Sequence, residues 1–101
     1  MKEKESDIVA AILDYLNLKS IFNYRQNTGA FKTQSGGFYR FGSLGSPDIV
    51  CVEKGKYIGI EVKKKGGWQN PNQKEFEGRL RLAGGEYLLV HSLEEVAKRF
   101  P

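Results

Sequence analysis

The stretch that decides the fold is GSPDIVCVEKGKYIGIEVKKK, which spans Gly45–Lys65. It contains two apolar runs, 48–52 and 57–62, separated by a short polar segment. Lys54 and Gly55 lie at the centre of that segment and suit a two-residue turn. The stretch therefore predicts two antiparallel strands joined by a tight turn.

The predicted hairpin gathers charged residues at its open end. Symmetric pairing about the turn sets Asp48 directly opposite Glu61, and Cβ atoms of such pairs lie about 4.5–5.5 Å apart. Lys63 shares their face because it follows Glu61 by two residues. Two carboxylates this close can hold one divalent ion. A glycine bulge at Gly55 is the alternative, and it would shift the register by one residue.

An amphipathic helix is predicted before the hairpin, over 5–18, from an apolar stripe at helical spacing. Glu5 falls on the axis of that stripe, within roughly 40° of Val9, Ile12 and Leu16. This position points Glu5 toward the core side of the helix. A solvated charge that complements the helix dipole is the competing interpretation.

The remaining segments complete an α/β pattern. We expect a strand over 21–27, a polar loop over 28–37 and a short strand over 38–41. Asn70, Pro71 and Gln73 resemble a capping box that opens a helix running to Ala83. A short strand over 87–90 and a last helix over 93–99, capped by Ser92, follow. Without the short strand over 38–41, these elements predict one α/β domain, 1–101, with a mixed sheet flanked by helices in the order αβββαβα.

Composition limits the classes of function. The chain has 101 residues and a formal net charge of +4, which permits a nucleic-acid partner without arguing for one. Its one cysteine, Cys51, lies in an apolar run and reads as a core residue. No stretch is long enough to span a membrane, and no signal-peptide core is present. We therefore expect a cytoplasmic protein, in the host cell cytoplasm if it is phage-encoded.

The order of these features resembles a known family. Pro47-Asp48, then twelve intervening residues, then Glu61-Val62-Lys63 resembles the PD-(D/E)XK nuclease signature. The leading Glu5 and the Gln73 that opens the next helix make the pattern similar to the virus-type replication-repair nuclease (VRR-NUC) family. The resemblance covers nearly the whole chain and implies a restriction-endonuclease-like core. It also implies a stand-alone nuclease domain of the kind that phages carry.

The resemblance implies a role for each site residue. Asp48, Glu61 and the Val62 carbonyl would bind Mg²⁺ or Mn²⁺, which prefer hard oxygen ligands. Glu5 would complete the metal shell, directly or through water. Lys63 would orient or deprotonate the attacking water, or else stabilise phosphate charge. Gln73 would position water or a phosphate.

Several other side chains are candidates for nucleic-acid contacts. The expected phosphate contacts are Lys64, Lys65, Arg25, Lys32 and Arg40. For each of them a solvated surface charge is an equally good interpretation. Trp68, in a basic loop, either stacks on a base or plugs an edge of the core. His91 reads as structural.

The favoured hypothesis is a Mg²⁺- or Mn²⁺-dependent DNA endonuclease for DNA repair that selects branched, junction or flap DNA. Paired cuts in a four-way junction need two active sites, so the resemblance also predicts a homodimer. The alternative is a non-catalytic nucleic-acid-binding or assembly module that keeps the nuclease fold. The gathered carboxylates argue against that alternative, because binding alone has no need for acids near phosphates.

Overall fold

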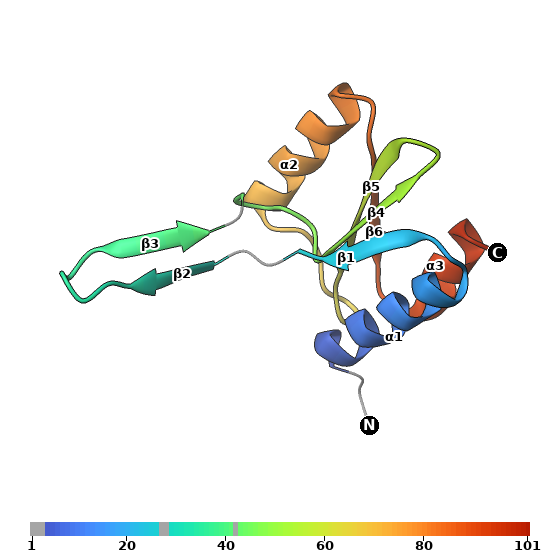
Figure 1. The fold of residues 1–101 in the computed structure, drawn as a ribbon, viewed down its shortest axis with the longest axis horizontal. Helices are drawn as coiled ribbons and strands as arrows, with labels where there is room; N and C mark the ends of the chain where they lie inside the picture. The colour runs from blue at the N-terminus through green and yellow to red at the C-terminus, as the bar shows by residue number, and fades with distance from the viewer. Residues whose placement is uncertain (1–3, 27–28, 42) are drawn as a thin grey trace.

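The computed structural model describes residues 4–26, 29–41 and 43–101; for 29–32 and 38–41 it describes the backbone only. Three helices and six strands make up this part of the chain (Figure 1). Their order and bounds are α1 (Glu5–Leu18), β1 (Phe22–Arg25), β2 (Gly29–Lys32), β3 (Phe38–Phe41), β4 (Ile49–Glu53), β5 (Lys56–Val62), α2 (Pro71–Leu82), β6 (Glu86–Val90) and α3 (Leu93–Arg99).

A four-stranded mixed sheet lies at the centre, in the order β1-β4-β5-β6. β1, β4 and β5 pair antiparallel, whereas β5 and β6 are parallel. A parallel pair needs a crossover connection, and α2 supplies it between β5 and β6. The predicted α/β class, with a mixed sheet and flanking helices, is confirmed.

The β4–β5 hairpin has the predicted register. Lys54 and Gly55 both have positive φ angles, 52° and 79°, as the two centre residues of a type I′ turn require. Ile49 pairs with Ile60 at the other end, and continuing this register sets Asp48 opposite Glu61. The alternative with a glycine bulge is excluded.

The two faces of the sheet are covered unequally. α1 and α3 pack on the face that carries Ile49, Cys51 and Ile60, and together they form the hydrophobic core (Figure 1). Cys51 is fully buried, and burial raises the pKa of its thiol to about 11, so it is an inert core residue as predicted. α2 lies against β6, and it has no buried residue. Because α2 only half-covers its face, polar side chains there keep access to solvent.

The expected loop over 28–37 is wrong in part, because Gly29–Lys32 forms a strand. β2 and β3 form a separate antiparallel hairpin, which extends away from the rest of the molecule in Figure 1. The Thr33 amide donates to the Gly37 carbonyl at 2.8 Å and the Gly37 amide donates to Thr33 Oγ1 at 3.1 Å. These local bonds close the turn, so the glycine-rich segment is a hairpin tip. Within the described residues there is therefore one strand more than the five expected from the sequence.

Three expected element ends also differ. The strand expected over 21–27 is β1, Phe22–Arg25, within the described residues. α2 ends at Leu82, one residue before the expected end, and Ala83 is its exposed C-cap residue. Ser92 makes no side-chain cap bond to α3, and Glu95 Oε1 instead accepts a bond from the His91 amide at 3.2 Å. In the part of the chain that the structure describes, no helix has the length and apolarity to cross a membrane.

Candidate active site

Glu61 is the one buried charged residue among those described, with a side chain in the middle of the molecule rather than on its surface. It lies on β5, which has a neighbouring strand on each side, and only 4 % of it is exposed. Its Oε1 atom is buried and has no hydrogen-bond partner within the described structure. A buried carboxylate oxygen without a partner is costly, so it points to a ligand or a proton.

Asp48 is held beside Glu61 by the backbone of the same strand. Its Oδ2 accepts a hydrogen bond from the Val62 amide at 2.8 Å. Pro47, just before it, is buried against Gly59, where an added Cβ would lie 2.7 Å from the proline Cγ. The proline thus packs the start of β4 against β5, and this packing fixes the position of the aspartate.

Two further predicted residues converge on the other oxygen of Glu61. Gln73 Nε2 donates to Glu61 Oε2 at 3.1 Å, and Lys63 Nζ lies 3.9 Å from the same atom. Gln73 is held by the expected capping box, in which its Oε1 accepts from the Asn70 amide and its own amide donates to Asn70 Oδ1. Oε2 is therefore satisfied from the protein while Oε1 is left free for another partner.

The site is short of positive charge. The pKa of Glu61 is raised from 4.5 to about 8, first by burial and then by the neighbouring Asp48 carboxylate. Lys63 opposes this shift and Glu5 adds to it, so the lysine alone does not offset the other effects. A divalent cation between the two carboxylates would supply the missing charge.

Glu5 lies at the edge of this cluster rather than inside it. It is exposed at the start of α1, and its Oε2 accepts from the Lys64 amide at 3.3 Å. Among the described residues, no group of three or more His, Cys, Asp or Glu side chains is arranged to hold a metal. The place of Glu5 in the metal shell, directly or through water, stays a prediction, whereas Asp48 and Glu61 form a close pair of carboxyl groups.

This pair fits Mg²⁺ or Mn²⁺. Mg²⁺ is usually bound by one or two carboxylates, with waters and phosphate oxygens completing its shell. The unpartnered Glu61 Oε1 is an available hard oxygen ligand next to Asp48. Val62, the third expected ligand through its carbonyl, lies at the end of β5, where its amide binds Asp48.

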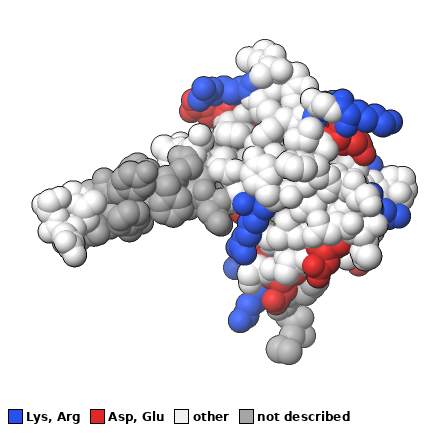
Figure 2. All heavy atoms as spheres, viewed as in Figure 1, with Lys and Arg blue, Asp and Glu red and all other residues white. Residues whose placement is uncertain are grey.

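The predicted phosphate-contacting residues are dispersed. Lys64 and Lys65 are exposed directly after β5, next to the site. Arg25 pairs with Ile49, so the register places it on the opposite sheet face from Asp48. Lys32 and Arg40 lie on β2 and β3, where side chains are outside the described part. Figure 2 shows basic side chains in separate groups mixed with acidic ones, without one continuous basic field on the face in view.

Sequence reasoning missed three residues behind the site. Tyr87 is buried and pairs with Gly59 across the parallel β5–β6 ladder, which puts it on the face of Glu61. Burial raises its pKa to about 12, against the opposing effect of Gln69. Gln69 Nε2 itself donates to Glu77 Oε1 at 2.8 Å. The register of a parallel crossover pair leaves no local pattern, so no sequence signal marked this group.

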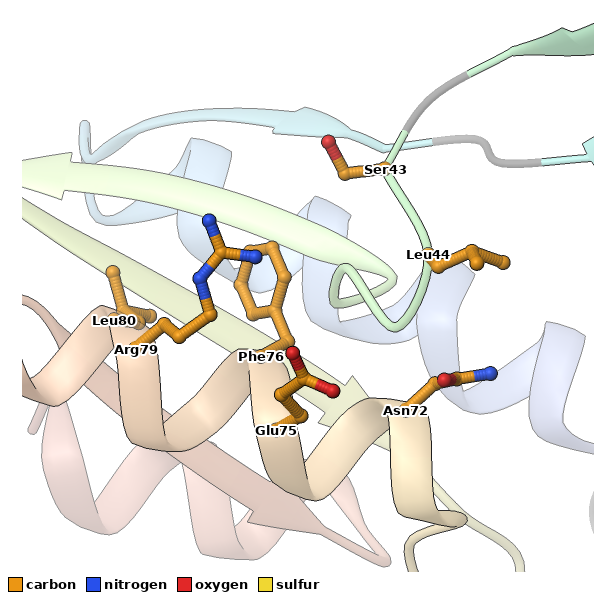
Figure 3. A pocket seen from close by; sticks show the side chains of 7 residues that line it. All are labelled: Ser43, Leu44, Asn72, Glu75, Phe76, Arg79 and Leu80. Carbon is orange, nitrogen blue, oxygen red and sulfur yellow. The ribbon is translucent and has the colours of Figure 1, made fainter.

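A pocket lies away from Glu61. It measures about 590 Å³ and opens between the β3–β4 loop and α2 (Figure 3). Its lining residues are Ser43, Leu44, Asn72, Glu75, Phe76, Arg79 and Leu80. None of the residues around Glu61 lines it, so it is separate from the candidate site.

No protein-family model matches the chain, and no curated protein is significantly similar to it.

Proposed function

We propose that this protein is a metal-dependent DNA endonuclease of the PD-(D/E)XK type. The observation that carries the proposal is Glu61, buried beside Asp48 with one carboxylate oxygen unpartnered and the other facing Lys63 and Gln73. A structural salt bridge would satisfy both oxygens of a buried acid. An acid that is left half-satisfied next to a second acid is typical of a cation site.

The proposal includes a restriction-endonuclease-like core similar to that of the VRR-NUC family. Apart from the β2–β3 hairpin, the elements follow the order αβββαβα. Three of the motif residues lie close together in this arrangement: Asp48 just before β4, Glu61 on β5 and Gln73 in the first turn of α2.

Each residue has a defined task in phosphodiester hydrolysis. A bound Mg²⁺ or Mn²⁺ would withdraw charge from the phosphate and make water nucleophilic near neutral pH. Asp48 and Glu61 would hold the cation, and Gln73 donates to Glu61 and so keeps its carboxylate in one orientation. Lys63 can reach a phosphate oxygen or the attacking water from its position beside Glu61.

The preferred substrate in this proposal is branched, junction or flap DNA. A chain of 101 residues offers little surface for reading base sequence, and exposed Lys64 and Lys65 would contact phosphates regardless of sequence. Cutting a junction at paired positions would require a homodimer.

A cleavage panel tests the proposal. Junction, flap, duplex and single-stranded DNA are incubated with Mg²⁺, Mn²⁺ or EDTA, using the wild type, Asp48→Asn, Glu61→Gln and the distal control Glu94→Gln. We expect cleavage that needs a metal, is lost in the first two variants and persists in the control. Unchanged cutting by both site variants would refute the assignment. Salt-sensitive binding without cutting under every condition would favour the non-catalytic module instead.

A further inference from the structure

Trp68 is an aromatic side chain that the protein leaves in water. Its exposed fraction is 65 %, so it does not plug an edge of the core. It lies on the loop between β5 and α2, six residues after the end of β5 at Val62 and five before Gln73. Gln73 donates a hydrogen bond to Glu61, and Lys63 lies beside the same carboxylate. Both ends of this loop are therefore anchored at the candidate active site.

The backbone that carries Trp68 is fixed on both sides. The Gly67 amide donates to the Lys64 carbonyl at 2.8 Å, and the Gly67 carbonyl lies 3.1 Å from His91 Nε2, which follows β6. On the other side, the Gln69 side chain is bonded to Glu77 of α2. The indole is therefore presented to solvent from a held loop.

The charged residues on the Trp68 loop indicate which kind of ligand the indole would bind. Lys64 and Lys65 are exposed on the same loop, four and three residues before Trp68, and give this loop positive charge. An aromatic face beside cations that track a phosphate backbone is the arrangement that binds single-stranded nucleic acid, because every base has a π-face to stack. Bases inside a duplex are already stacked on their neighbours, so an indole can reach only an unpaired or terminal base.

We infer that Trp68 is a stacking platform for one unpaired nucleobase next to the phosphate that the proposed cation at Asp48 and Glu61 would bind. The inference rests on the proposed nuclease function and narrows its substrate class to nucleic acid with a single-stranded segment at the cut. It also supplies a physical reason for a preference for flaps and junctions: duplex DNA cannot offer Trp68 a free base.

Trp68 is the only tryptophan in the chain, so its intrinsic fluorescence reports on this site directly. The wild-type protein in EDTA, where metal-dependent cleavage cannot occur, is titrated with a short single-stranded oligothymidine. We expect saturable quenching. A relaxed, covalently closed circular duplex and an oligonucleotide of abasic sugar-phosphate should leave the emission unchanged, since neither offers an unpaired or terminal base.

Variants separate stacking from charge. Trp68→Ala should weaken single-strand binding about fivefold to a hundredfold, as measured by anisotropy of a labelled oligonucleotide, and Trp68→Phe should retain part of the affinity. The matched control is Phe22→Ala, which removes an equally exposed aromatic from β1 and should bind as wild type. Melting temperatures should be unchanged in Trp68→Ala, because the indole packs on little.

Four results would overturn the inference: no quenching by the oligothymidine, equal quenching by the abasic strand, equal affinity in Trp68→Ala, or emission that changes only with protein concentration. The last would assign Trp68 to contact between copies of the chain. The two proposals fail separately. Quenching without cleavage under any metal would refute the nuclease and leave the stacking site, whereas metal-dependent cleavage without quenching would do the reverse.

Discussion

Gln73 joins the start of α2 to the carboxylate of Glu61: one end of its amide donates to Glu61 Oε2 at 3.1 Å, and the other accepts from the Asn70 amide at 2.9 Å. A single side chain thus completes a helix cap and orients a candidate metal ligand. The two roles can be separated by substitution, because Asn70 takes part only in the cap.

Gln73→Ala and Asn70→Ala form a matched pair. Each removes half of the capping box, so each should lower the free energy of unfolding by about 1 kcal/mol. Only Gln73→Ala also frees the Glu61 carboxylate, so only it should lower the rate of metal-dependent cleavage clearly at saturating DNA. Urea unfolding and single-turnover cleavage measure the two effects. Equal cleavage rates in both variants would limit Gln73 to capping.

The metal-free protein should lose stability as the pH rises from about 4.5 to about 8. The pKa of Glu61 is raised from 4.5 to about 8 in the folded state, so the folded chain holds a proton there that the unfolded chain has released. The slope of stability with pH is therefore negative in this window. Thermal melts in EDTA would show it, and Glu61→Gln should flatten the profile. A profile as steep in Glu61→Gln as in the wild type would assign the slope to other groups.

Stabilisation by Mg²⁺ or Mn²⁺ should have the opposite pH dependence. A cation needs the ionised carboxylate, so binding displaces the proton from Glu61 and becomes tighter as the pH rises toward about 8. The increase in melting temperature at a fixed metal concentration should be larger at pH 8 than at pH 6. Asp48→Asn should remove it. Metal-induced stabilisation that persists in Asp48→Asn would place the cation elsewhere.

Lys63 and Lys65 should behave differently although they lie two residues apart. Lys63 faces Glu61 Oε2, whereas Lys65 is exposed. Lys63→Met should lower the cleavage rate about a hundredfold to ten-thousandfold, the range for a positioned acid–base group. Lys65→Met should weaken DNA binding uniformly and reduce the salt slope by about one, as loss of one phosphate contact does. Similar rate losses in both variants would contradict the separate roles.

Gly45 should be the least replaceable glycine near the site. Its φ is +78°, and an added Cβ would lie 2.2 Å from the Asn72 carbonyl oxygen of α2. Gly55 has a similar φ of +79° but open space around it, so Gly55→Ala should cost only about 1–2 kcal/mol of backbone strain. Gly45→Ala should lower the free energy of unfolding, measured in urea, by more than Gly55→Ala does. It should also slow cleavage, because the added Cβ would push the loop before Asp48 away from α2. Equal losses of unfolding free energy in the two variants would show that the loop can move away from α2 without strain.

The parts of the site that sequence reasoning predicted are those set by local rules. Lys54 and Gly55 fix the turn, the turn fixes the register, and the register sets Asp48 opposite Glu61. The capping box of Asn70 and Gln73 is equally local. In each case residues close in sequence determine the geometry.

The parts that could not be predicted depend on contacts between distant segments. The register of β6 against β5 is set by a crossover connection. Neither the position of Tyr87 nor the burial of Glu61 could therefore be predicted from the sequence. β2 was missed because a four-residue strand next to glycines has the composition of a loop. Glu5 has the expected helical position, but the packing of α1 leaves it at the edge of the cluster.

The division of the β-sheet into a local hairpin and a parallel crossover has a consequence for folding kinetics. β4 and β5 are joined by a two-residue turn and can pair within microseconds, which brings Asp48 and Glu61 together while both are still hydrated. Docking of α2 and β6 is a later, non-local event, and it is the event that removes water from Glu61. Uptake of a proton or a metal ion is therefore coupled to that late step, and we expect refolding at pH 8 to be faster with Mg²⁺ than in EDTA.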